Sequence, residues 1–115
     1  MTTSLGRLTQ NYTPAFLAFL NKPDEQRLHR AYELGRTALA DGITLLDLVR
    51  THHAAFGQLV TTLDTAAQAR AVDDAASFLI EALAPFEMAR RGYLERARED
   101  QHLPNRSRAV EPGTF

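Results

Sequence analysis

The sequence contains no cysteine and no tryptophan, and its 115 residues include a single lysine. Without cysteine the protein cannot form a disulfide, use a thiolate as a nucleophile or bind zinc through sulfur. Its 13 basic and 14 acidic residues leave a formal net charge of −1. Because no overall field then attracts nucleic acid or an anionic membrane surface, we expect neither as a partner.

Long apolar runs are missing as well. Nowhere do the ~18 consecutive apolar residues of a membrane-spanning helix occur. Residues 1–10 lack the basic and apolar regions of a signal peptide. A chain of 115 residues, 44% of them hydrophobic, can form one modest core. We therefore expect a soluble, cytoplasmic protein with a single domain.

Apolar residues recur at helical spacing along most of the chain, and no segment shows sustained strand-type alternation. The first helix should end near Asn21. It contains Pro14, where it either kinks or restarts with Thr13 as its cap. A second helix should begin around residues 23–25 and stop at Gly42, which can adopt the left-handed conformation. A third should open with the capping pattern of residues 44–47.

The fourth helix should begin near Thr65 and be long, with a kink at Pro85, which lacks the amide that would bond to the carbonyl of Glu81. We expect its core-facing residues to be Val72, Ala75, Ala76, Leu79, Leu83, Phe86, Ala89, Tyr93 and Leu94. After Asp100 the helical periodicity is lost. The pattern predicts a helical domain over residues 1–102 and a flexible tail or the start of a linker over 103–115.

Four amphipathic helices joined by short turns predict an all-α, four-helix bundle-like domain with a kinked, long fourth helix. The first helix is apolar on more than one side, with Leu17 and Leu20 beside Phe16 and Phe19. A helix of this kind needs a second surface to bury against. We therefore expect the domain to form a homodimer.

Histidine is the residue type most able to carry chemistry here. Glu25, His29 and Glu33 share one helix face at i, i+4 and i+8, which suits a metal or proton-transfer site, or more simply a solvated or partner-binding face; we favour the latter two. A carboxylate-bridged di-iron bundle needs two Glu-x-x-His pairs, and the chain has one, at Glu99 and His102. We expect no metal site, no cofactor and no catalytic residue.

His52 and His53 are adjacent, so their rings diverge by about 100° around the helix. One should face inward and be hydrogen-bonded, while the other faces solvent. An outward histidine on a helical bundle could accept a phosphoryl group, as in histidine phosphotransfer proteins. No lysine lies near either position, which argues against this alternative.

Three stretches carry a resemblance to a known family: YTPAFLAFL, then AYELGRTALADGITLLDLVRTHHAAF, then FLIEALAPFEMARRGYLERA. Together they resemble the N-terminal domain of RsbU-type phosphoserine phosphatases, regulators of bacterial stress-response sigma factors. The resemblance covers residues 12–98, and the run that begins at Phe78 is its most specific part. It implies an all-helical, dimeric domain whose first helix contributes to a bundle shared between chains.

The resemblance also implies a partner: a switch protein related to the anti-sigma kinases, bound by the second and fourth helices. Glu25 and Ile80 match family positions on that surface. His29 stands where the family has an aromatic residue, and Ala84 where it has a larger aliphatic one. For Ile80, a contact within the core or between two copies remains an alternative.

We therefore expect a non-catalytic regulatory domain that binds a switch kinase through Glu25, His29, Ile80 and Ala84. Two alternatives are open. The first is a histidine phosphotransfer protein that uses His52 or His53. The second is a bundle that senses a small molecule, for which an apolar cavity near Phe56 and Phe86 is expected.

Overall fold

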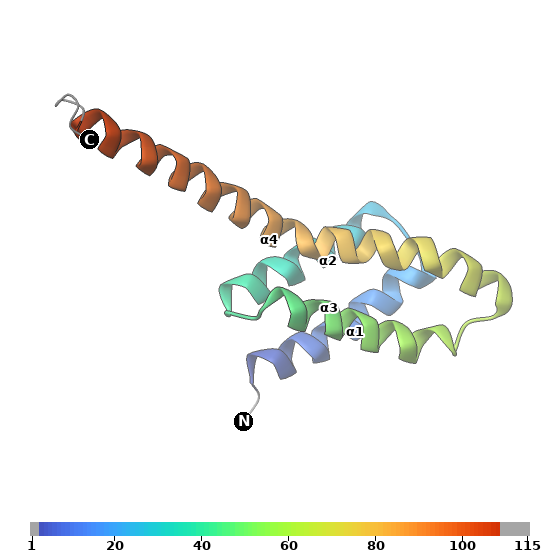
Figure 1. Ribbon diagram of the computed structural model, residues 1–115. Coiled ribbons are helices and arrows are strands. Elements are labelled where there is room, and N and C mark those ends of the chain that lie inside the picture. Colours follow the sequence, from blue (N-terminus) through green and yellow to red (C-terminus); the bar gives the residue numbers. More distant parts are fainter. Residues whose placement is uncertain (1–2, 109–115) are drawn as a thin grey trace.

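The computed structural model describes the backbone of residues 3–108 and the side chains of residues 3–99. Four helices make up this part of the chain: α1 (Ser4–Asn21), α2 (Glu25–Ala40), α3 (Leu45–Val60) and α4 (Thr65–Arg108). The expected all-α, four-helix fold is confirmed. In Figure 1, α1, α2, α3 and the first half of α4 pack together, and the second half of α4 extends away from them.

Local side-chain chemistry sets where the helices begin. The side chains of Thr3, Asp24, Thr44 and Asp64 each accept a hydrogen bond from the backbone amide three residues later, at 2.8–3.1 Å. Such caps satisfy amides that have no partner within the helix. Gly42 has a φ of 79°, which a residue with a side chain rarely adopts. It therefore turns the chain between α2 and α3, as predicted.

An aromatic cluster forms the centre of the core. Tyr12 and Phe16 of α1 and Phe78 of α4 are fully buried. The Phe16 ring stacks on Phe78, with centroids 4.9 Å apart, and on the buried His52 of α3, at 4.7 Å. α1 thus lies against both α3 and α4, and it runs through Pro14 without restarting.

α2 and α4 approach each other closely at Gly35. A Cβ atom on this residue would lie 1.9 Å from the carbonyl oxygen of Ala82. Ala31 and Ala38, one turn to either side on α2, are also buried. Small residues on both helices let the two backbones pack together, and this close packing outweighs the low helix propensity of glycine.

The core-facing side of α4 differs from the expected one. The buried residues are Ala71, Ala75, Phe78, Ala82 and Pro85. Val72, Ala76, Ala89, Tyr93 and Leu94, expected to face inward, are exposed. Ala75 is buried as expected, and Leu79, Leu83 and Phe86 are half-buried. The prediction was wrong at the other five positions because α4 carries apolar residues on more than one side, and the fully buried side is the one that contains Phe78.

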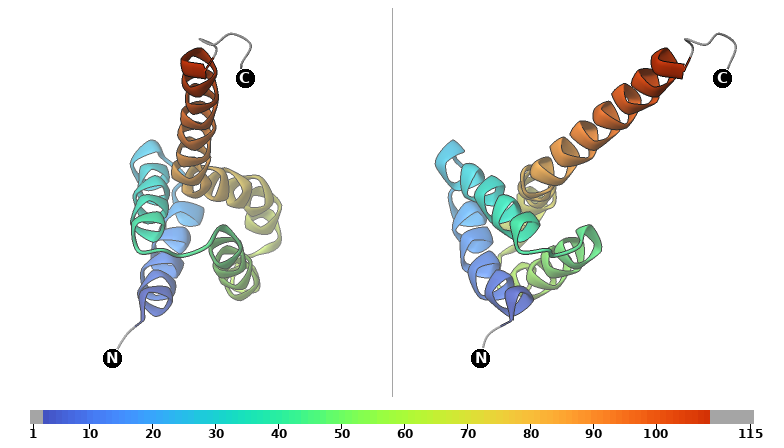
Figure 2. Two further views of the ribbon diagram at one scale, coloured as in Figure 1. Left: turned by 60° about the vertical axis from the view of Figure 1, so that its left-hand side comes forward. Right: turned by 90° about the vertical axis from the view of Figure 1, so that its left-hand side faces the viewer.

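Figure 2 shows α4 changing direction between its yellow and orange parts, the stretch that contains Pro85 and where a kink was expected. Beyond this bend, residues 87–108 form what we call the arm, which has no other helix beside it. α4 continues to Arg108, so the domain boundary expected at residue 102 falls inside this helix. Residues 109–115 of the expected tail lie outside the described residues.

Candidate partner-binding site

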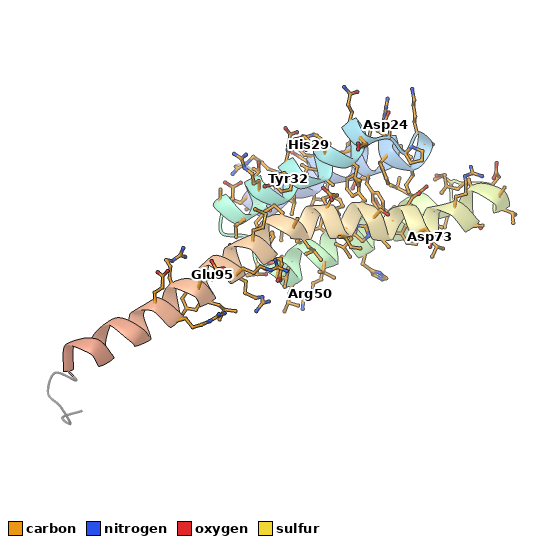
Figure 3. All side chains as sticks on the ribbon, turned by 90° about the horizontal axis from the view of Figure 1, so that it is seen from above. Asp24, His29, Tyr32, Arg50, Asp73 and Glu95 are labelled. Carbon is orange, nitrogen blue, oxygen red and sulfur yellow. The ribbon has the colours of Figure 1, made fainter. Side chains whose placement is uncertain are left out.

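The four residues expected to bind a partner come from two neighbouring helices, Glu25 and His29 from α2 and Ile80 and Ala84 from α4. α2 packs against α4 more extensively than against any other helix. Figure 3 shows this side of the molecule, with His29 and Tyr32 labelled on α2 and Asp73 on α4. We call the outward surface of these two helices the α2/α4 face.

Ile80 is directed away from the core by the helical period of α4. Phe78 and Ala82, two residues to either side, are completely buried, and Ile80 is 65% exposed. Ala84, one turn further along, is half-buried. A core contact for Ile80 within this chain, one of the alternatives left open by the sequence, is therefore excluded. A β-branched apolar side chain that water surrounds on a folded helix is available to a partner.

Glu25 and His29 are both exposed on α2. The Nε2 atom of His29 lies 3.7 Å from a carboxylate oxygen of Glu33, and its ring stacks on that of Tyr32, with centroids 5.7 Å apart. Because a ring packed on a second ring loses little rotamer freedom on binding, His29 presents an ordered flat surface. The half-buried ring of Tyr32 also belongs to this face, although it was not among the residues expected from the sequence.

The possibility of a metal or proton-transfer site on this face was raised by Glu25, His29 and Glu33. In the described part of the chain, no three His, Asp or Glu side chains come together as metal ligands. Glu33 and His29 form a carboxylate–imidazole pair on this face, and more than half of each side chain is exposed to water. His102, which completes the single Glu-x-x-His motif, lies outside the described side chains.

His52 and His53 divide as expected, one inward and one outward. His52 is 8% exposed, and its Nδ1 atom lies 2.7 Å from the Tyr12 hydroxyl. Burial and the nearby His53 lower the pKa of His52 to about 4. Burial also raises the pKa of Tyr12 above its usual range. Because His52 is enclosed in this way, only the exposed His53 remains available for the phosphotransfer alternative.

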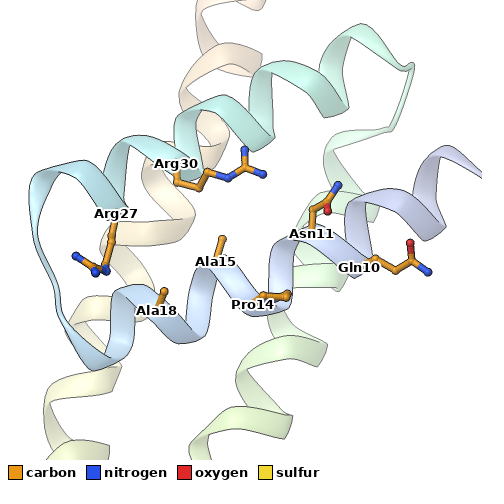
Figure 4. Close-up of a pocket in the computed structure, with 7 residues that line it drawn as sticks. All are labelled: Gln10, Asn11, Pro14, Ala15, Ala18, Arg27 and Arg30. Carbon is orange, nitrogen blue, oxygen red and sulfur yellow. The ribbon is translucent and has the colours of Figure 1, made fainter.

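A groove of about 360 Å³ lies between α1 and α2 (Figure 4), where Arg27 and Arg30 of α2 stand over Pro14, Ala15 and Ala18 of α1. Arg27 is held at 2.5 Å by the carboxylate of Asp24. Neither Phe56 nor Phe86 lines this groove or three smaller ones formed by other described residues. The small-molecule alternative therefore gains no support at the position where it was expected.

None of the four helices, over the residues described, combines the length and apolarity needed to cross a membrane.

A family model described as the N-terminal domain of the phosphoserine phosphatase RsbU matches residues 10–89, well over half of the chain. The match includes the whole α2/α4 face and stops close to where the arm begins. No curated protein and no solved structure matches the chain.

Proposed function

Because this chain belongs to the family of RsbU N-terminal domains, we propose that it binds a switch kinase of the anti-sigma type through its α2/α4 face. In that family this domain is the regulatory, non-catalytic part of a phosphatase in sigma-factor signalling. The observation that carries the proposal is the exposure of Ile80 within the matched segment, near its C-terminal end. The proposed role puts the protein in the bacterial cytoplasm.

The chemistry of the face fits protein binding. An aliphatic anchor, an ordered ring pair and a carboxylate at the start of α2 make a mixed surface of the kind that protein interfaces use. His29 and Ala84 depart from the residues that the family resemblance implies, and the two changes make the surface flatter and less apolar. We infer that the kinase recognised by this chain has a correspondingly different surface.

We also propose that the protein acts as a homodimer. Leu17 and Leu20 of α1, which suggested self-association, are already half-buried against the core of the single chain. Of the ten large apolar side chains exposed in the described chain, three lie on the arm, where Met88 is 60%, Tyr93 66% and Leu94 40% exposed. A second copy that covered them would remove this apolar area from water.

The binding proposal can be tested with the purified switch kinase from the same cell and the substitution Ile80→Asp. Because truncating or charging a central anchor typically costs 2 kcal/mol or more, we expect the dissociation constant to rise at least ~30-fold. Calorimetric titration measures this, and circular dichroism should show unchanged helicity, since Ile80 contacts solvent rather than the core.

A matched control is Leu46→Asp, because Leu46 is 63% exposed on the first turn of α3. This change alters charge and apolar area as much as Ile80→Asp does, and an acidic residue is favourable at a helix N-terminus. It should leave the affinity unchanged. Equal loss in both variants, or no loss in either, would contradict the proposal.

A further inference from the structure

The carboxylates nearest to Ile80 on α4 have no basic partner. From Ala71 to Ala89 the helix contains four acidic residues and no Lys, Arg or His. Asp73 precedes Ile80 by seven residues and is therefore only about 20° from it around the helix. Asp73 is exposed, and Asp74 and Glu81 are half-buried, about 120° and 100° from Ile80 around the helix.

Elsewhere in the described chain, five carboxylates pair with arginine, and Glu25, Asp64, Glu95 and Glu99 form no ion pair. Glu87 binds Arg90 and Arg91. Further pairs join Asp41 to Arg7, Asp24 to Arg27, Glu33 to Arg30 and Asp47 to Arg50. None of these pairs includes Asp73, Asp74 or Glu81. Asp73, Asp74 and Glu81 thus give the stretch of α4 around the exposed Ile80 a local negative charge that none of these ion pairs neutralises.

The exposed isoleucine and the unpaired carboxylates indicate the chemistry of the partner's surface. Anionic surfaces such as nucleic acid are repelled, and an uncharged apolar surface would leave the carboxylates partly desolvated without partners. A surface of opposite charge would compensate them and orient the two proteins as they approach.

We propose that the α2/α4 face binds a protein surface with an apolar socket for Ile80, rimmed by Arg and Lys side chains that face Asp73, Asp74 and Glu81. This inference rests on the proposed function, since the same face binds the partner in both. It adds that the association is electrostatically steered.

Stopped-flow measurement of the association rate with the purified switch kinase, at NaCl concentrations from about 20 to about 300 mM, tests the inference. For the unaltered chain we expect the rate to fall at least ~10-fold over this range, because exposed charges are screened beyond roughly one Debye length. The variant Asp73→Asn/Asp74→Asn/Glu81→Gln should associate roughly tenfold more slowly at low salt, and nearly independently of salt.

The matched control is Glu95→Gln/Glu99→Gln, which removes two exposed carboxylates of the arm and should leave the rate and its salt dependence largely unchanged. The single substitution Asp73→Lys, at an exposed position, provides a second variant and should slow association further. The inference is overturned if the association rate is independent of salt, or if the neutralised variant shows the same salt dependence as the unaltered chain. In either case Ile80→Asp still tests the proposed function separately. If the kinase does not bind at all, both fall.

Discussion

His52 is a buried base whose proton affinity differs between the folded and unfolded chain. Its pKa is lowered to about 4 in the folded protein, against about 6.5 in an unfolded chain. At neutral pH both rings of the Tyr12–His52 pair are uncharged, so the Tyr12 hydroxyl can donate its proton to Nδ1. This contact joins α1 to α3 inside the aromatic cluster.

The sign of the pH dependence follows from this difference. Between pH 6.5 and 4 the unfolded chain binds a proton at His52 that the folded chain does not. The stability contributed by neutral His52 is therefore present above this range and is lost as the pH falls through it. From pH 7 to pH 4.5 we expect His52 to lower the free energy of unfolding by about 2 kcal/mol. Urea denaturation at several pH values measures this.

The variant His52→Asn serves as the control, because an amide can replace Nδ1 as a hydrogen-bond partner of Tyr12 and does not titrate in this range. The cavity it leaves lowers stability at every pH. The informative quantity is therefore the slope of stability against pH, which should flatten relative to the unaltered chain. An unchanged slope would show that His52 is not the group responsible.

The sequence predicts the orientation of the two adjacent histidines because geometry alone separates their rings. It does not predict which of them is inward, since both have the same side chain. The rotation of α3 about its own axis decides which histidine is inward, and this rotation is set by Leu48, Thr51 and Ala55, which are buried on the same side as His52. Ile80 was equally undecided between core and surface until the buried positions of α4 were known.

At the scale of the helices, Gly35 controls how closely α2 approaches α4. Replacing glycine by alanine within a helix normally stabilises it by up to ~1 kcal/mol. At this position the added Cβ would meet the backbone oxygen of Ala82 at 1.9 Å, so the two helices must move apart. We expect Gly35→Ala to destabilise the fold by roughly 2–3 kcal/mol, measured by chemical denaturation.

Gly57 provides the matched substitution, because a Cβ there would meet nothing within 4 Å. Gly57→Ala in α3 should follow helix propensity and stabilise the protein by up to ~1 kcal/mol. The two variants make the same chemical change with opposite expected signs. If Gly35→Ala also proved stabilising, the close contact between α2 and α4 would be contradicted.

Helix boundaries could be predicted from the sequence because caps and turn residues act locally. The expected caps and stops at Thr44 and Gly42 are confirmed. The buried side of α4 could not be predicted because it depends on what packs against it. Apolar residues occur on more than one side of α4, and the buried side combines Phe78 with the alanines that Gly35 can approach. Which residues of α4 belong to the α2/α4 face follows from which side of the helix is buried.

At the scale of the whole molecule, the arm is the least covered part of the described chain. A compact globule of this length would have a radius of gyration of about 13 Å, and the protein has one of 20.0 Å. If a second copy covers the apolar side chains of the arm, light scattering at micromolar concentration should give twice the chain mass of 12.8 kDa.

A chain that ends at Ala89, the last residue of the family match, separates the arm from the bundle. It retains every residue of the buried core, so we expect nearly unchanged thermal unfolding and the mass of a monomer. A full-length chain that scatters as a monomer would contradict the dimer proposal. A dimer of the shortened chain would assign the interface to the bundle instead.

The central claim is that the α2/α4 face receives the partner, and the most direct measurement is the footprint of the bound switch kinase on the amide NMR spectrum of the chain. We expect shifted or broadened signals for residues 25–33 of α2 and 72–84 of α4, with the outward side of α3 around His53 unaffected. A footprint confined to α3 or to the arm, with the α2/α4 signals unchanged, would contradict it.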